Sequence, residues 1–170
     1  RPQRSSAFSL VELIVSMAIL ALLLVGAVSM GRAVDARKSN VAAERFAACI
    51  EQARHAAISR RKDVLVSIRD LSGKQMTLGQ WETGDGSEPK PIGRERELPQ
   101  GVDFSSADLT KQEFPCSGGQ SDAWVLKVDR HGRLVLPEGS GLVTVSLRSN
   151  EESKPRVLRI ARSTARVLNF

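Results

Sequence analysis

The sequence predicts an α+β fold in which one long N-terminal helix precedes a β-rich globular domain. An apolar run at residues 13–30 continues without a break into a helical pattern that extends to about Arg61. From Val64 onwards the chain instead carries short alternating or β-branched apolar segments, separated by turns rich in Gly, Pro and Asp. One helix followed by six to nine short strands indicates an α+β domain with mainly antiparallel pairing.

The apolar run is long enough to cross a membrane. Its 18 residues read LIVSMAILALLLVGAVSM and include no charge. In a helix they span about 27 Å, close to the hydrocarbon thickness of about 30 Å. A removable secretory signal would have a shorter apolar core, of about 7–15 residues, followed by a small-residue cleavage site. The sequence therefore favours a retained anchor over a removable signal.

The second half of the helix, residues 32–62, is predicted to be amphipathic. Charged residues such as Glu44 and Arg45 fall outside its apolar face and are predicted to meet solvent. The basic run at residues 60–62 suits a helix C-terminus, where cations complement the helix dipole. The apolar face, with spacings of three and four, comprises Ala42, Phe46, Cys49, Ile50, Ala53 and Ala57.

Strand signals fill the remainder of the chain. We predict loops at residues 82–100 and 114–122, with two weak strand signals, at residues 92–98 and 102–105, around the Pro-Gln-Gly at residues 99–101. The tetrapeptide at residues 129–132, Asp-Arg-His-Gly, predicts a hairpin turn. The predicted strands are residues 64–68, 76–81, 92–98, 102–105, 123–128, 133–136, 142–147, 156–161 and 165–168.

The net charge of +6 has two sources. Arg1 and Arg4 contribute part of it, whereas residues 8–140 hold 17 basic and 17 acidic residues. The remaining excess lies in the last thirty residues. There, Arg148, Lys154, Arg156, Arg159, Arg162 and Arg166 oppose Glu151 and Glu152. A local excess of this kind is the electrostatic footprint expected for phosphate contacts.

The residues that could carry catalysis or bind metal are few and scattered. Cys49 and Cys116 lack metal-ligand spacing. A disulfide between them would fit an extracytoplasmic domain, and the alternative is one buried helical cysteine and one unrelated loop cysteine. His55 lies one helical turn from Glu51, which predicts a solvated pair, and His131 lies at a turn tip. The sequence predicts no metal site, no cofactor and no enzymatic activity.

Glu12 is the one charged residue between residues 5 and 31. At the centre of a membrane span a carboxylate costs about 2.5 kcal/mol or more, whereas at headgroup depth the cost is small. Its surroundings, Ala-Phe-Ser-Leu-Val-Glu-Leu at residues 7–13 after a basic leader, resemble the class III signal of type IV pilins and pseudopilins.

The resemblance implies a processing and assembly role for these residues. Prepilin peptidase would remove residues 1–7 by cutting after Ala7, where the family usually has Gly, and Phe8 would become the methylated N-terminus. Glu12 would then neutralise the terminal amine of a neighbouring subunit, because two charges that lipid excludes singly are tolerated as a pair.

The end of the helix resembles the GspH/FimT pseudopilins, whose Ala-Arg-x-x-Ala-Ile core is matched by Ala53, Arg54, Ala57 and Ile58. This resemblance implies a helix on two β-sheets and a minor pseudopilin of a type II secretion or type IV pilus machine. It also implies a single-pass inner-membrane protein with a periplasmic C-terminal domain and other pseudopilins or pilins as partners. The expected division is a leader at 1–7, a transmembrane half-helix at 8–31, an amphipathic half-helix at 32–62 and a β domain at 63–170.

DNA uptake is the alternative function. Some FimT-like relatives bind DNA through a basic C-terminal region, so the candidate residues here are Arg156, Arg159, Arg162 and Arg166. The relatives' Gly-Arg-x-Arg end is not reproduced, because this chain keeps one arginine and has Ala165 in place of the glycine. No aromatic residue among them offers a stacking platform for bases.

Overall fold

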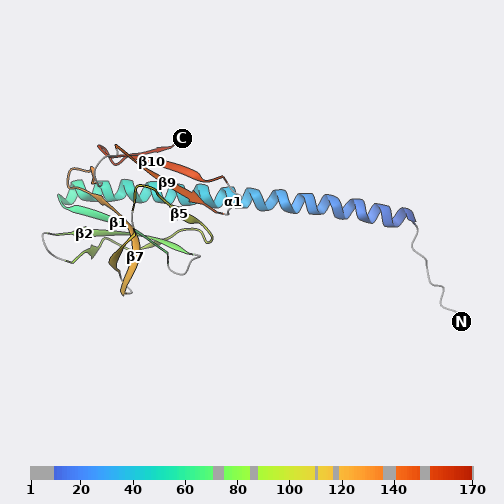
Figure 1. Ribbon diagram of the computed structural model, residues 1–170, viewed down its shortest axis with the longest axis horizontal. Helices are drawn as coiled ribbons and strands as arrows, with labels where there is room; N and C mark the ends of the chain where they lie inside the picture. Colours follow the sequence, from blue (N-terminus) through green and yellow to red (C-terminus); the bar gives the residue numbers. More distant parts are fainter. Residues whose placement is uncertain are drawn as a thin grey trace.

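The computed structural model describes residues 10–70, 75–84, 88–109, 111–116, 119–135, 141–149 and 154–169. A single helix, α1 (Leu10–Arg60, 51 residues), opens the described chain. Figure 1 shows that its first half extends away from the rest of the molecule, while its second half lies along the β domain. The sequence therefore forms one continuous helix with two different environments.

The described strands form two antiparallel sheets. They are β1 (Asp63–Asp70), β2 (Met76–Thr83), β3 (Lys90–Pro91), β4 (Arg96–Glu97), β5 (Asp103–Ser105), β6 (Lys111–Cys116), β7 (Gly119–Val128), β8 (Leu134–Val135), β9 (Leu142–Arg148), β10 (Arg156–Ala161) and β11 (Val167–Asn169). A seven-stranded sheet has the order β3-β2-β1-β7-β6, with β4 paired to β2 and β8 to β7. A four-stranded sheet has the order β11-β10-β9-β5. The predicted α+β fold with a two-sheet antiparallel domain is confirmed.

The second half of α1 packs against both sheets. All six residues of the predicted apolar face are buried, with exposed fractions of 2% or less. Phe46 of α1 lies 5.9 Å from Phe104 of β5, measured between ring centroids, and Phe104 lies 5.0 Å from Trp124 of β7. These three rings therefore connect the helix, the four-stranded sheet and the seven-stranded sheet across one core.

The prediction of a loop at residues 114–122 is wrong. This stretch belongs to a hairpin in which Phe114 pairs with Ser121 and Cys116 with Gly119. Pro115 is tolerated in β6 because this strand lies at a sheet edge, where a strand has a neighbour on one side only. The predicted total of six to nine strands is also too low, since the described residues form eleven.

Candidate functional site: the exposed helix and the basic tail

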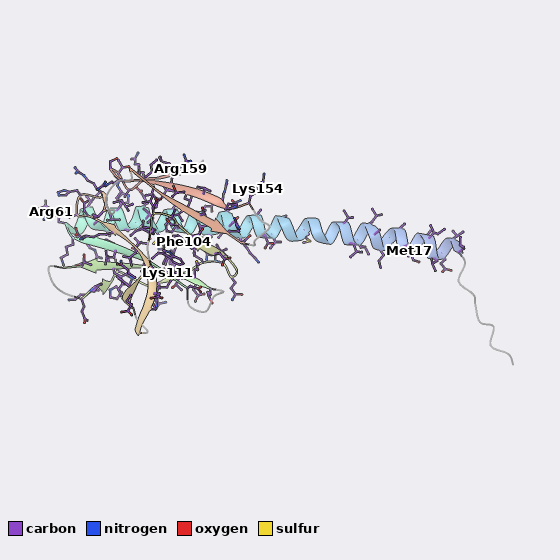
Figure 2. All side chains as sticks on the ribbon, viewed as in Figure 1. Met17, Arg61, Phe104, Lys111, Lys154 and Arg159 are labelled. Atoms are coloured by element: carbon purple, nitrogen blue, oxygen red, sulfur yellow. The ribbon has the colours of Figure 1, made fainter. Side chains whose placement is uncertain are left out.

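The first half of α1 presents apolar side chains with nothing from its own chain to cover them. Each large apolar residue between Leu10 and Val25 is more than half exposed, as Met17 illustrates in Figure 2. Contiguous apolar surface of this extent marks an interaction site, because leaving it in water costs about 25 cal/mol per Å². Among the residues of α1 that the structure describes, no segment is both long and apolar enough to cross a membrane.

Glu12 lies in the first turn of this exposed half. Its side chain is exposed, and its main-chain carbonyl accepts a hydrogen bond from Ser16 Oγ at 2.5 Å. Ala7 and Phe8 lie outside the described residues, so the processing site stays a prediction. The described geometry leaves the Glu12 carboxylate accessible to a neighbouring molecule.

The four arginines proposed for DNA are not gathered on one face. Leu158 and Ile160 of β10 point into the core, so Arg159 between them points to the opposite, exposed face. Arg156 instead lies at the start of the strand, and its Nε donates to Asn40 Oδ1 of α1 at 2.8 Å. Strand alternation thus places Arg156 and Arg159 on different faces of β10.

The other two arginines flank the turn after β10. Arg162 borders a hollow beside Arg133, and Arg166 precedes β11. Ala165, which stands where the FimT-like motif has glycine, is buried and has a φ of 47°. That left-handed conformation is one that glycine adopts without strain.

Cys49 is a free, buried thiol in the structure. Burial raises its pKa above the usual value, and Gln80 Nε2 lies 3.4 Å from its Sγ and donates to its carbonyl oxygen at 2.9 Å. Of the two alternatives, the structure has the buried helical cysteine at Cys49 and no bridge there, whereas Cys116 ends strand β6 and does not lie in a loop. The side chain of Cys116 lies outside the described ones.

Neither histidine contributes to a reactive site in the described chain. His55 Nε2 lies 3.4 Å from Glu51 Oε1 and its side chain is 72% exposed, as expected of a solvated helical pair. His131 is exposed in the turn after β7. Within the described ranges, no group of three or more His, Cys, Asp or Glu side chains could hold a metal ion.

A cationic surface that the sequence analysis missed lies at the C-terminal end of α1. Arg61 and Arg130 line two adjoining hollows, one with Lys62 and Lys127 and the other with Ile58 and His131. Figure 2 places Arg61 at the end of the domain opposite to the protruding helix. The available signal was the pair of basic stretches at residues 60–62 and 127–133, but only the fold brings them together.

The protruding apolar helix and the two-sheet domain behind it define a type IV pilin-like protein. Residues 2–28 match the prokaryotic N-terminal methylation motif, and residues 42–164 match the type II transport protein GspH family. The chain therefore belongs to the GspH family, whose members are structural pseudopilins. The curated proteins and solved structures compared with it give no match.

Two general properties of this chain follow from the family assignment. In type IV pilin-like proteins the methylation motif indicates an N-terminal membrane anchor and processing by prepilin peptidase. Membership of the GspH family indicates a pseudopilin role and assembly with other pilins or pseudopilins.

Proposed function

We propose that this chain is a minor pseudopilin of a type II secretion pseudopilus or a related type IV pilus-like machine. The observation that carries the proposal is the uncovered apolar half of α1, which includes a single acidic residue, Glu12, near its start. In this proposal residues 8–31 cross the inner membrane and the β domain lies in the periplasm. The same apolar surface then contacts lipid before assembly and neighbouring helices after assembly.

Glu12 would set the register of assembly. After removal of residues 1–7, the charged amine of Phe8 would lie at the membrane, where an unpaired charge is costly. The Glu12 carboxylate of one subunit would neutralise the Phe8 amine of the next, since neither charge is stable in lipid alone. Because this pairing satisfies both groups at one axial position, it favours one stagger between adjacent helices.

Replacement of Glu12 tests the proposal. The Glu12→Val variant should insert in the membrane and fold normally, because no described contact of the β domain involves Glu12. It should nevertheless fail to enter filaments or support secretion. Filament recovery by shearing, secretion assays and the circular dichroism of purified protein would measure the two effects separately.

A matched control comes from the same helix. Ser16→Val removes a polar group one turn further along α1 and should assemble normally. Glu12→Gln keeps the size of the side chain but not its charge, and it should behave like Glu12→Val. If Glu12→Val and Glu12→Gln both assemble at the wild-type level, Glu12 has no pairing role and merely lies at headgroup depth.

A further inference from the structure

The end of the domain opposite to the protruding helix holds a group of cations that we call the distal cradle: Arg61, Lys62, Lys127 and Arg130. The hollow that all four residues line has a volume of about 690 Å³. In Figure 1 this end is where α1 finishes and β1 begins. The distal cradle is far along the helix from the apolar half that the proposed function uses, so the inference below goes beyond that function.

The carboxylates near the distal cradle are already engaged. Asp63 Oδ2 lies 2.7 Å from Lys127 Nζ, and Asp63 Oδ1 accepts from the Arg130 main-chain N–H at 3.1 Å. Glu82 pairs with both Arg60, at 2.8 Å, and Lys62. Within the described parts of the chain, no carboxylate forms a salt bridge with the guanidinium group of Arg61 or Arg130, and Arg130 interacts with Asp63 only through their charges and through its main-chain N–H. Both side chains are exposed and therefore free to meet a ligand.

The turn that carries Arg130 is held rigidly. Asp129 Oδ1 accepts from the main-chain N–H groups of His131 at 2.9 Å and Arg133 at 2.8 Å, which closes the turn on itself. Gly132, with a φ of 76°, lies so close to Ile58 that a Cβ there would come within 2.8 Å of its Cδ1. This turn therefore packs closely on the end of α1 and sets the main-chain position of Arg130, whose side chain is exposed.

Arg61 has a left-handed backbone conformation that residues other than glycine disfavour. It has a φ of 53° directly after the helix end, where glycine is the favoured residue. A non-glycine residue in this conformation costs about 1–2 kcal/mol. Strained residues of this kind concentrate at binding and switch sites, because the surrounding structure must sustain them. The main-chain positions of both arginines of the distal cradle are thus set by the local structure, whereas their side chains are exposed.

We propose that the distal cradle binds an acidic segment of a partner protein, with carboxylates on Arg61 and Arg130 and an apolar neighbour on Ile58. Ile58 is 44% exposed beside both arginines, which suits a mixed acidic and apolar peptide. Asp63 and Glu82 already pair with Lys127 and Lys62, so the described surface offers two arginines without a salt bridge and not the continuous row of cations that a phosphate backbone contacts. No aromatic side chain lines either hollow for base stacking.

The test uses the full chain in uncharged detergent and a fluorescent Glu-Glu-Leu-Glu-Glu peptide, with binding followed by anisotropy at low salt. Arg61→Gly and Arg130→Gln should each weaken binding about tenfold, because each removes a charge-assisted hydrogen bond. Affinity should also fall as salt is added. Arg61→Gly should at the same time raise the thermal midpoint by about 2–4 °C, since it relieves the strained φ.

Arg37→Gln is the matched control, because Arg37 is exposed on α1 away from the distal cradle. It changes the charge equally and should leave peptide binding unchanged. The proposal is wrong if the chain does not bind the peptide, if Gln-Gln-Leu-Gln-Gln binds as well, or if Arg37→Gln weakens binding equally. It is also wrong if duplex DNA binds more tightly than the peptide and loses that binding in Arg61→Gly and Arg130→Gln, which would make the surface a nucleic-acid site.

Discussion

The two halves of α1 share one helical backbone but differ in what covers them. In the first half, residues such as Leu20 and Leu23 are more than 60% exposed. In the second half, Phe46, Ile50 and Ala53 are completely buried against the β domain. The first half is apolar all round, whereas the second is apolar on one stripe only. That difference separates a helix that needs an external apolar environment from one that its own domain stabilises.

In the proposed function, folding and assembly therefore use different halves of α1. The buried stripe belongs to the core shared by both sheets, so changes there act on the stability of the domain. Changes in the exposed half alter contacts that form only with lipid or with another molecule. Equivalent substitutions on the two halves should consequently give opposite patterns of defects.

The largest expected effect separates the two halves by stability. Phe46→Ala should lower the free energy of unfolding by about 3–5 kcal/mol, because it empties a buried site that Phe104 contacts. Leu20→Ala should change it by less than about 0.5 kcal/mol, since its side chain is already 63% exposed. Chemical unfolding of the full chain in detergent, followed by the fluorescence of Trp81 and Trp124, measures both.

Leu20→Ala also provides the complementary measurement. It should reduce filament assembly or membrane association while the unfolding curve of the domain stays in place. Equal destabilisation by the two substitutions would mean that the exposed half also stabilises the fold. The two halves of α1 would then not have separate roles.

Much of this division could be predicted from the sequence. Continuous apolarity at residues 13–30 and the stripe that includes Phe46 and Ile50 are local patterns, readable because a helix repeats every 3.6 residues. The turn at residues 129–132 was predictable for a similar reason, since Asp and Gly occupy the positions that tight turns favour.

The features that the sequence did not reveal depend on pairing over distance. The hairpin around residues 114–122 contains Gly, Ser and Pro, and its strands are stabilised by each other and by the contact of Phe114 with Trp81, 5.4 Å away. No local period encodes that contact. Likewise, Arg61 and Arg130 are far apart in the chain, and the pairing of β1 with β7 and the packing of Gly132 on Ile58 bring them to one surface.

A smaller effect on stability is expected for the ion pair between Asp63 and Lys127, near the C-terminal end of α1. Burial alone would raise the pKa of Asp63, but its hydrogen bond and charge interaction with Lys127 and the N–H of Arg130 hold that pKa below the usual value. A lowered folded-state pKa gives stability that is present above about pH 4, the unfolded value, and lost as pH falls through the folded value.

The Asp63→Asn variant tests the contribution of this ion pair to stability. It should be less stable than the wild type at pH 7, by less than about 1 kcal/mol because the pair is partly exposed. The difference should shrink as the pH falls below about 4, because the Asp63 carboxylate is protonated first in the unfolded chain and only at lower pH in the folded one. Unfolding curves measured from pH 7 to pH 2 would show it, with Asp35→Asn on α1 as a control. A difference that stays constant over that range would mean that the charge of Asp63 does not contribute.

The smallest effect is expected for DNA, and a large one would overturn the view that assembly through the helix is the main function. The wild-type chain in uncharged detergent should bind a DNA duplex weakly, with binding lost at physiological salt. Replacing Arg156, Arg159, Arg162 and Arg166 together with glutamine should change this little, because strand alternation and the contact with Asn40 separate Arg156 from Arg159. If the arginines contacted the DNA phosphate backbone, the slope of log binding constant against log salt concentration would decrease by about 0.9 for each phosphate contact removed. Tight binding near 150 mM salt that the four substitutions abolish would therefore assign the basic tail to DNA uptake, because only converging phosphate contacts survive such screening.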